Sequence, residues 1–368
     1  MKITAIDSFL LVIPYHTEGG VHAIAGRPAA GLTMLLVRVR TDDGLEGWGE
    51  AFGHACAAST QTALTTLVGP FFIGRDPAGI AALMGEAQRR LHIFGRSGPV
   101  AYALSGIDIA LWDLAGKVAG LPLYRLLGAA PRRDLPAYAS LLRSSGPTAA
   151  AHSARAVCAG GVAHIKLHEI ELAPVSAVRA AVGPDIAIML DTNCPWSVAE
   201  AIDMAERLRA CDLYWLEEPV WPPEDHAGLA RVRAGGTVIA AGENAASACE
   251  FAALLAAGAI DVAQPSVCKI GGVTEMQRIF ALAAAAGIRV VPHCGYLGAG
   301  FLATLHLTAT LPGETLVERL SIAPEANPFG DRTAVAAGRV AVPQGPGLGC
   351  DPDWQVIERY AVVPVRRD

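Results

Sequence analysis

The sequence has no apolar run long enough to cross a membrane, and it has no block of lysine or arginine residues. Its most apolar stretch, Ile279 to Val291, is interrupted by Gly287 and Arg289, whereas a transmembrane helix needs about 20 apolar residues. The N-terminus lacks the continuous apolar core of a signal peptide, because Asp7 interrupts it. These absences argue against a membrane partner and predict a soluble, cytoplasmic protein.

Charge is also scarce, because charged residues make up 17% of the chain and the net charge is −6. A protein that binds nucleic acid needs a basic surface against the phosphates, so a nucleic-acid partner is disfavoured. The eight cysteines include no CxxC pair and no zinc-ligand spacing, which predicts reduced, mostly buried thiols. Hydrophobic residues, in contrast, make up 52% of the 368 residues. That is enough for a barrel of roughly 200–250 residues beside a second domain.

The first 132 residues mix strand and helix patterns. Residues 34–39 are rich in strand formers, and a turn at 41–44 separates them from residues 45–50, which favours an antiparallel sheet of three strands. From about residue 60 to 127 the pattern becomes helical. Residues 15–31 hold four glycines and show no periodicity, which predicts a long loop. Such loops in compact domains are usually functional or disordered.

After Arg133 short apolar runs recur, each ending in a polar residue and most followed by an alanine-rich helical stretch. Their polar ends lie 23 to 27 residues apart. Eight strands at this spacing indicate βα units that close into an α/β barrel with the helices outside. The tail from about Ile322 to Asp368 has no helical period, and we expect it to fold back onto the N-terminal domain. The eight runs are residues 135–141, 163–168, 186–191, 213–217, 238–243, 260–266, 288–293 and 315–318.

The carboxyl ends of barrel strands meet on one face, where the active sites of such barrels lie. Three consecutive strands each deliver one carboxylate there, namely Asp191, Glu217 and Glu243. One acid alone would more often be a helix cap or a surface ion pair, but three at matched spacing repel each other unless a cation neutralises them. Oxygen-only ligation suits Mg²⁺ or Mn²⁺. The remaining polar residues at these strand ends are Lys166, His168, Asn193, Ser266, His293 and Glu318.

Basic side chains flank the predicted metal strands on both sides. Lys166 and His168 lie two residues apart on one strand and therefore face the same way, and His293 ends a strand on the other side. A lone histidine is more often structural than catalytic, but these bases all lie beside the metal site. A metal that holds a carboxylate would let such a base remove the proton on the neighbouring carbon.

These motifs resemble those of the enolase superfamily, and within it the mandelate racemase group. The resemblance covers nearly the whole chain. It rests on the helix Ser105–Lys117 with the following Gly-Leu-Pro, on the runs 189–193, 215–219 and 241–244 that carry the acids, and on 269–272, 291–293 and 317–320 in family order.

The resemblance implies a modified TIM barrel of the (β/α)7β kind, with an α+β N-terminal capping domain that the C-terminal segment completes. We expect residues 1–132 to form the capping domain, 133–321 the barrel, and 322–368 the segment that packs on the cap. It also implies Mg²⁺ on the three acids, two basic groups on the second barrel strand, His293 as the opposite acid or base, and Glu318 bonded to the substrate carboxylate. A homo-oligomer, either a dimer or an octamer, is implied as well. The substrate-binding residues would be Asn193, Ser266, Tyr15, His22, His54 and Tyr296.

Two positions depart from the family pattern. The usual Lys-x-Lys of the second strand reads Lys166-Leu167-His168, so His168 stands at the position of the base, and a protonated Lys166 should lower its pKa. An aspartate that normally orients the histidine is replaced by Ser266, which should make His293 a weaker base. Lys269 is interpreted as structural.

The sequence therefore predicts Mg²⁺-dependent removal of the α-proton of a small-molecule carboxylic acid. Dehydration of a sugar acid to a 2-keto-3-deoxy acid is favoured, because it needs one base and one acid rather than two equal bases. A racemase or epimerase of a 2-hydroxy acid and a sugar-lactone cycloisomerase are the alternatives. A barrel that binds its ligand without turnover is a remote one, and the sequence does not identify the substrate.

Overall fold

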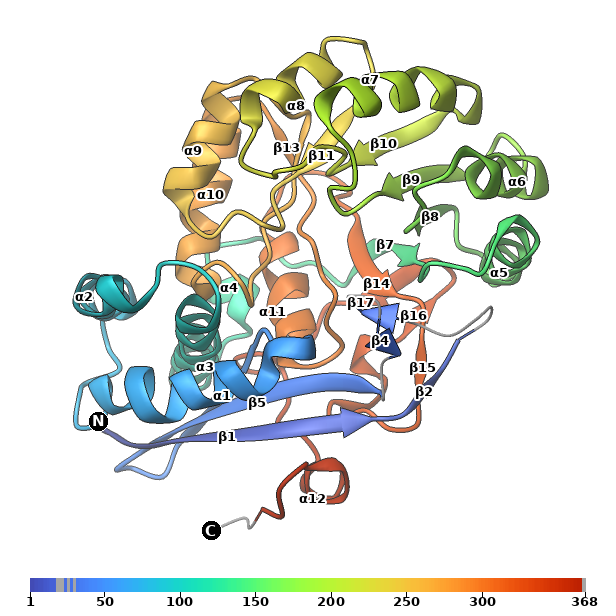
Figure 1. Cartoon of the computed structure of the whole chain (residues 1–368). Coiled ribbons are helices and arrows are strands. Elements are labelled where there is room, and N and C mark those ends of the chain that lie inside the picture. Colours follow the sequence, from blue (N-terminus) through green and yellow to red (C-terminus); the bar gives the residue numbers. More distant parts are fainter. Residues whose placement is uncertain (18–22, 25–26, 29–30, 366–368) are drawn as a thin grey trace.

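The computed structural model describes residues 1–17, 23–24, 27–28 and 31–365, and shows a capping domain beneath a barrel (Figure 1). The cap has a three-stranded antiparallel sheet in the order β1-β5-β6. In β5 alternate side chains are buried against different neighbours, because Leu35 and Val37 pack with the helices of the cap while Met34 and Leu36 join the core of the barrel. The strands are β1 (Ile3–Ile13), β5 (Leu32–Thr41) and β6 (Glu46–Ala51), and the helices are α1 (Ala57–Ala63), α2 (Ile80–Leu91), α3 (Pro99–Ala119) and α4 (Leu123–Leu126).

The barrel contains eight parallel strands, in agreement with the predicted fold class. Seven of them pair in sequence order from β7 to β13, and β14 closes the barrel by pairing with β7. Each of the first seven is followed by a helix, which gives the (β/α)7β arrangement. The strands are β7 (Asp134–Ser140), β8 (His164–Leu167), β9 (Ala187–Asp191), β10 (Leu213–Glu217), β11 (Ile239–Ala241), β12 (Val262–Ala263), β13 (Arg289–Val290) and β14 (Val317–Leu320). The helices are α5 (Pro147–Ala159), α6 (Leu172–Val182), α7 (Val198–Arg207), α8 (His226–Arg233), α9 (Ala248–Ala256), α10 (Gly272–Ala285) and α11 (Ala299–Thr308).

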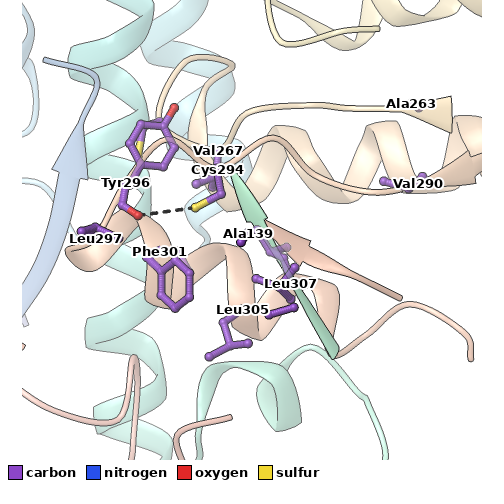
Figure 2. Packing of buried hydrophobic residues seen from close by; sticks show 14 of the residues in the cluster. Ala139, Ala263, Val267, Val290, Cys294, Tyr296, Leu297, Phe301, Leu305 and Leu307 are labelled. Atoms are coloured by element: carbon purple, nitrogen blue, oxygen red, sulfur yellow. Dashed lines mark hydrogen bonds between the residues drawn. The ribbon is translucent and has the colours of Figure 1, made fainter. Parts of the chain in front are cut away.

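Helix α11 lies between the barrel and the cap sheet, and every one of its residues is buried (Figure 1). Its apolar side chains fill the space between the two layers, which accounts for a helix that is hydrophobic on all sides. Figure 2 shows part of this core, with Phe301, Leu305 and Leu307 of α11 and with Cys294 and Tyr296 from the segment after β13. The packing holds that segment in place, and His293 at its start lies in the candidate site described below.

The cap and the barrel are also joined through Asp108 of α3, which caps the N-terminus of α10. Its carboxylate accepts hydrogen bonds from the backbone N–H and the hydroxyl of Thr274, at 3.0 and 2.5 Å. A Cβ atom at Gly272 would lie 2.3 Å from Asp108 Oδ1, and Gly272 has φ +81°. Glycine is therefore required here, and the contact fixes the segment that carries Lys269 against the cap.

The C-terminal segment contacts both domains. The hairpin of β16 (Val335–Ala336) and β17 (Arg339–Ala341) extends the barrel sheet, because β17 pairs with β7. Helix α12 (Trp354–Tyr360) lies beneath the cap sheet, where the Trp354 ring packs against Phe9 and Trp48 (Figure 1). The tail contains this helix although its sequence shows no helical period, because a helix of seven residues is too short to show one.

Residues 15–31 are not a plain loop. Strand β2 (Tyr15–His16) pairs with β15 (Ala323–Pro324), and β3 (Ala23–Ile24) pairs with β4 (Arg27–Pro28). The prediction of a loop without regular structure is therefore wrong for β2, β3 and β4, which lie in this segment. None of the helices in the described part of the chain is long and apolar enough to cross a membrane.

Candidate active site

Three acidic side chains converge at the carboxyl ends of neighbouring barrel strands. Asp191 and Glu217 are the last residues of β9 and β10 and are paired in register, and Glu243 follows β11 by two residues. One carboxylate oxygen from each lies within 4.8 Å of the others. The three acids predicted from the sequence are thus brought together in a geometry that could hold a metal ion.

Lys166 lies beneath these acids and has no solvent exposure. Its Nζ atom is 3.1 Å from Asp191, 2.9 Å from Glu217 and 2.8 Å from Glu318. Burial opposes the charge on Lys166, but the carboxylates around it outweigh burial and raise its pKa well above the usual value. Lys166 is therefore a permanent cation at the floor of the site.

One lysine does not neutralise so many acids. Burial raises the pKa of Glu217 to about 8, and although Lys166 lowers it, the charges of Asp191 and Glu318 act in the same direction as burial. Glu217 therefore favours a proton in this arrangement, although Trp215 and Gln264 both donate hydrogen bonds to its Oε2 atom. A divalent cation would remove that imbalance, so the donor set fits a hard metal ion.

Glu318 is bonded to two groups of the protein. Its Oε2 atom accepts the backbone N–H of Cys294 at 2.7 Å, and its Oε1 atom contacts Lys166. Burial raises its pKa, but Lys166 and His293 outweigh burial and lower the pKa to about 2. An ionised Glu318 accepts hydrogen bonds, so the implied bond to a substrate carboxylate would need a proton that this environment disfavours.

His168 reaches the acids from the β8 side. Its Nδ1 atom lies 2.6 Å from the carbonyl oxygen of Leu141, and its Nε2 atom lies 3.3 Å from Asp191. A carbonyl oxygen only accepts, so Nδ1 carries a proton and Nε2 is left to accept one in the neutral ring. The register of β8 on β9 pairs Leu167 with Leu190, which explains why His168 meets Asp191.

The expected lowering of the His168 pKa is wrong. Burial does lower it, and Lys166 acts in the same direction, but the hydrogen bond and the charge of Asp191 outweigh both. The pKa of His168 is therefore raised. The sequence places Lys166 two residues from His168, but the contact with Asp191 on the next strand forms only in the fold.

His293 reaches the acids from the opposite end of the cluster. Its Nε2 atom is 2.8 Å from Glu243 Oε2, and its Nδ1 atom is 2.9 Å from Ser266 Oγ. The hydroxyl of Tyr296 is in turn bonded to Ser266. Both Ser266 and Tyr296 are buried behind His293, so the structure places them as its supports rather than on the wall that a substrate would touch.

A cavity of about 650 Å³ opens above the acids. Of the predicted site residues, Asp191, Glu243, Glu318, His168, His293, Asn193 and His54 line it. Lys166 and Glu217 are buried below it, Tyr15 is not among its lining residues, and His22 lies outside the described residues. Asn193 has φ +54° and donates two hydrogen bonds to Asp191 Oδ1, which holds that oxygen in place.

Sequence reasoning did not place two cations on the cavity wall. Lys269, interpreted as structural, lies on the wall with its Nζ atom 3.4 Å from Glu243 and 5.1 Å from the centre of the Phe52 ring. Arg143, three residues after β7, also lines the cavity. A lone cation in the loop after the first barrel strand was the available signal, because such loops build the active sites of barrels.

Family models match both parts of the chain. The "Enolase C-terminal domain-like" model matches residues 149–356, and the "Mandelate racemase / muconate lactonizing enzyme, N-terminal domain" model matches residues 17–128. A D-galactarolactone cycloisomerase from Agrobacterium fabrum is 35% identical, over 95% of this chain and 96% of its own. A D-gluconate dehydratase from Thermoproteus tenax is 34% identical, over 90% of this chain and 70% of its own. The crystal structure of a racemase from Streptomyces coelicolor with bound magnesium has a TM-score of 0.85 at 29% identity, over 98% of this chain and 100% of its own.

Proposed function

Because the chain belongs to the mandelate racemase / muconate lactonizing enzyme family of the enolase superfamily, we propose that it dehydrates a sugar acid to a 2-keto-3-deoxy acid. One observation carries the proposal. The two histidines approach the acid cluster from different ends, and their partners differ, so they are suited to different tasks. Relatives that are named sugar-acid dehydratases support the same chemistry.

We assign Mg²⁺ to Asp191, Glu217 and Glu243. Support comes from the three oxygens within 4.8 Å, from the burial and neighbouring acids that raise the pKa of Glu217 and oppose its charge unless a cation is bound, and from the related structure with bound magnesium. When bound, the ion supplies positive charge beside the substrate carboxylate, where negative charge develops as the α-proton leaves. Lys166 adds a second, fixed positive charge at the floor of the same site.

His168 is the proposed base. Its Nδ1 proton is held by the Leu141 carbonyl, so the ring gains and loses its second proton at Nε2, which faces the acid cluster, and in the neutral ring this atom accepts the α-proton. The electron pair of that C–H bond forms a double bond to the neighbouring carbon as the β-hydroxyl leaves. The enol that results becomes a 2-keto acid when it takes up a proton.

His293 is the proposed acid for the leaving hydroxyl. Its Nε2 atom faces Glu243, which only accepts, so this nitrogen carries the proton that a leaving hydroxyl needs to depart as water. The serine on Nδ1 provides no negative charge to strengthen the ring as a base. The site is therefore unequal on its two faces, which disfavours a racemase with two matched bases.

Cycloisomerisation of a sugar lactone is the second candidate. It is favoured by the D-galactarolactone cycloisomerase, because that relative is 35% identical and the match covers nearly all of both chains. Both candidates begin with removal of the proton next to a carboxylate, so the same base is required.

The test is incubation with Mg²⁺ and a set of sugar acids and sugar lactones in D₂O, followed by proton NMR. A 2-keto-3-deoxy acid that appears as the α-proton signal disappears supports the dehydratase when it forms from a sugar acid, and supports the cycloisomerase when it forms by ring opening of a lactone. Loss of the α-proton signal without a new product would point to an epimerase. Full turnover by His168→Asn would contradict the assigned base, and Glu206→Gln on the exposed face of α7 is the control for handling of the protein.

A further inference from the structure

One basic side chain of the cavity wall differs from the others in its partners. Lys269 and His293 contact Glu243, and His168 contacts Asp191, so each is matched by a carboxylate. Arg143 lines the same cavity, yet among the residues that the structure describes its guanidinium contacts only a carbonyl oxygen. That oxygen belongs to His168, 2.7 Å from Arg143 Nε.

The bond to the His168 carbonyl holds the Arg143 guanidinium in place but does not neutralise its positive charge. Arginine has five N–H donors in a planar fork and stays charged at any working pH. The bond to His168 uses the Nε donor and leaves the four N–H groups of the two terminal nitrogens. A fork held by its Nε atom in a cavity is suited to bind a carboxylate through two parallel hydrogen bonds.

The position of Arg143 separates this fork from the metal cluster. The ring of His168 contacts Asp191, whereas the backbone carbonyl of the same residue holds Arg143, which lies beyond the end of β7. If the reacting carboxylate of the substrate lies over Asp191, Glu217 and Glu243, then Arg143 lies beside a more distant part of the substrate. Arg143 itself is exposed to solvent, and the partly buried apolar side chains of Ile170 and Leu320 line the same cavity.

We infer that Arg143 binds a second carboxylate of the substrate, so that the enzyme acts on sugar diacids rather than on sugar monoacids. The inference rests on the proposed function for the reaction at the first carboxylate. The inference specifies the group at the far end of the substrate as a carboxylate, because a hydroxymethyl group there would leave the guanidinium without an anion to bind.

Two pairs of probes test the inference, because each pair differs only in the group at the far end. Galactarate carries a carboxylate where D-galactonate carries a hydroxymethyl group, and D-glucarate differs from D-gluconate in the same way. Binding is measured by calorimetry with Mg²⁺ in a His293→Asn background, which prevents the completed reaction, and kcat/KM is measured in the parent enzyme. The variants are Arg143→Gln and Arg143→Lys, and Arg207→Gln at the exposed end of α7 makes the same charge change away from the cavity.

The inference predicts that at least one diacid binds about 10- to 100-fold more tightly than its monoacid partner, which is the range for hydrogen bonds between charged groups. Arg143→Gln should weaken diacid binding more than monoacid binding and so remove this preference. Arg143→Lys should retain part of it, because the charge stays but the fork is lost. Arg207→Gln should leave it intact.

Three results would overturn the inference. These are diacids that bind no better than monoacids or do not bind, a preference that survives Arg143→Gln, and an equal loss for both members of a pair. The last result would mean that Arg143 only positions His168 through its carbonyl. Failure of the proposed function is a separate outcome, because it appears as absence of α-proton exchange in the parent enzyme whichever acid binds.

Discussion

Ser266 Oγ lies 2.9 Å from Nδ1 of His293, and the hydroxyl of Tyr296 is bonded to the same oxygen. A serine at this position holds the imidazole ring in place but adds no negative charge beside it. The bond to Ser266 therefore orients the ring so that Nε2 faces Glu243, as an aspartate partner could also do while adding a negative charge. This contact makes the two faces of the site chemically unequal.

Ser266→Asp should reduce that inequality. A carboxylate beside Nδ1 strengthens His293 as a base, and such supporting groups change activity about 10- to 100-fold. We expect the variant to exchange the α-proton of the opposite stereoisomer at least about 10-fold faster than the parent. Deuterium incorporation into the two C2 epimers of a turned-over acid measures this, and Ser266→Ala is the control that removes the bond without adding charge. If the ratio of deuterium in the two epimers is the same in Ser266→Asp and in the parent, the Ser266 and Tyr296 hydroxyls do not limit the activity of His293 as a base.

Glu217→Gln should separate metal binding from stability. Burial and two neighbouring acids raise the pKa of Glu217 to about 8, so removing its charge should leave the metal-free protein as stable as the parent or more stable. The same change removes a metal ligand, so the rise of Tm that Mg²⁺ causes in the parent should disappear. Thermal unfolding with EDTA and with Mg²⁺ measures both effects. If Mg²⁺ raises the Tm of Glu217→Gln as much as it raises the Tm of the parent, Glu217 is not a metal ligand.

The barrel could be predicted from the sequence because apolar runs ending in polar residues recur about once per βα unit. The family prediction is confirmed, and so are the cap and the barrel. Strands β12 and β13 have only two residues each, so Ser266 and His293 lie in the segments beyond them. The predicted residues still reach the site, because those segments continue toward the same face.

The supporting contacts could not be predicted, because each depends on two segments that meet only in the folded chain. Tyr296 bonds Ser266 across 30 residues, and Asp191 meets His168 through the register of two neighbouring strands. The sign of the His168 pKa shift was wrong for this reason. Arg143 was missed although it is a lone cation in the loop after the first barrel strand, because its bond to the His168 carbonyl joins two segments that meet only in the folded chain.

Gly272→Ala should destabilise the junction between cap and barrel. The added Cβ would lie 2.3 Å from Asp108 Oδ1, and the backbone at φ +81° disfavours any side chain. We expect a loss of about 2–4 kcal/mol in the free energy of unfolding, because the backbone strain at residue 272 and the loss of the Asp108 cap on α10 both contribute. Gly85→Ala in α2 is the matched control, since no atom lies within 4 Å of its added Cβ and alanine is the better helix former. Urea unfolding of both variants gives the comparison, and equal stabilities would show that the junction tolerates the methyl group.

Asp108 should make the stability of the parent fall as the pH rises. Burial raises the pKa of Asp108 to about 7, against the opposing hydrogen bonds from Thr274. The folded state therefore holds a proton that the unfolded chain releases near pH 4, so the contribution is fully present below about pH 4 and is lost as the pH rises to about 7. Asp108→Asn cannot titrate and can still accept the Thr274 N–H. Its stability relative to the parent should therefore increase from pH 4.5 to pH 7.5, by up to a few kcal/mol. Urea unfolding across this range measures the difference, with Asp185→Asn at an exposed position before β9 as the control, whose difference should stay constant. If the Asp108→Asn difference is also constant, the buried carboxylate is already ionised at the low end of the range, and Thr274 rather than a proton stabilises it.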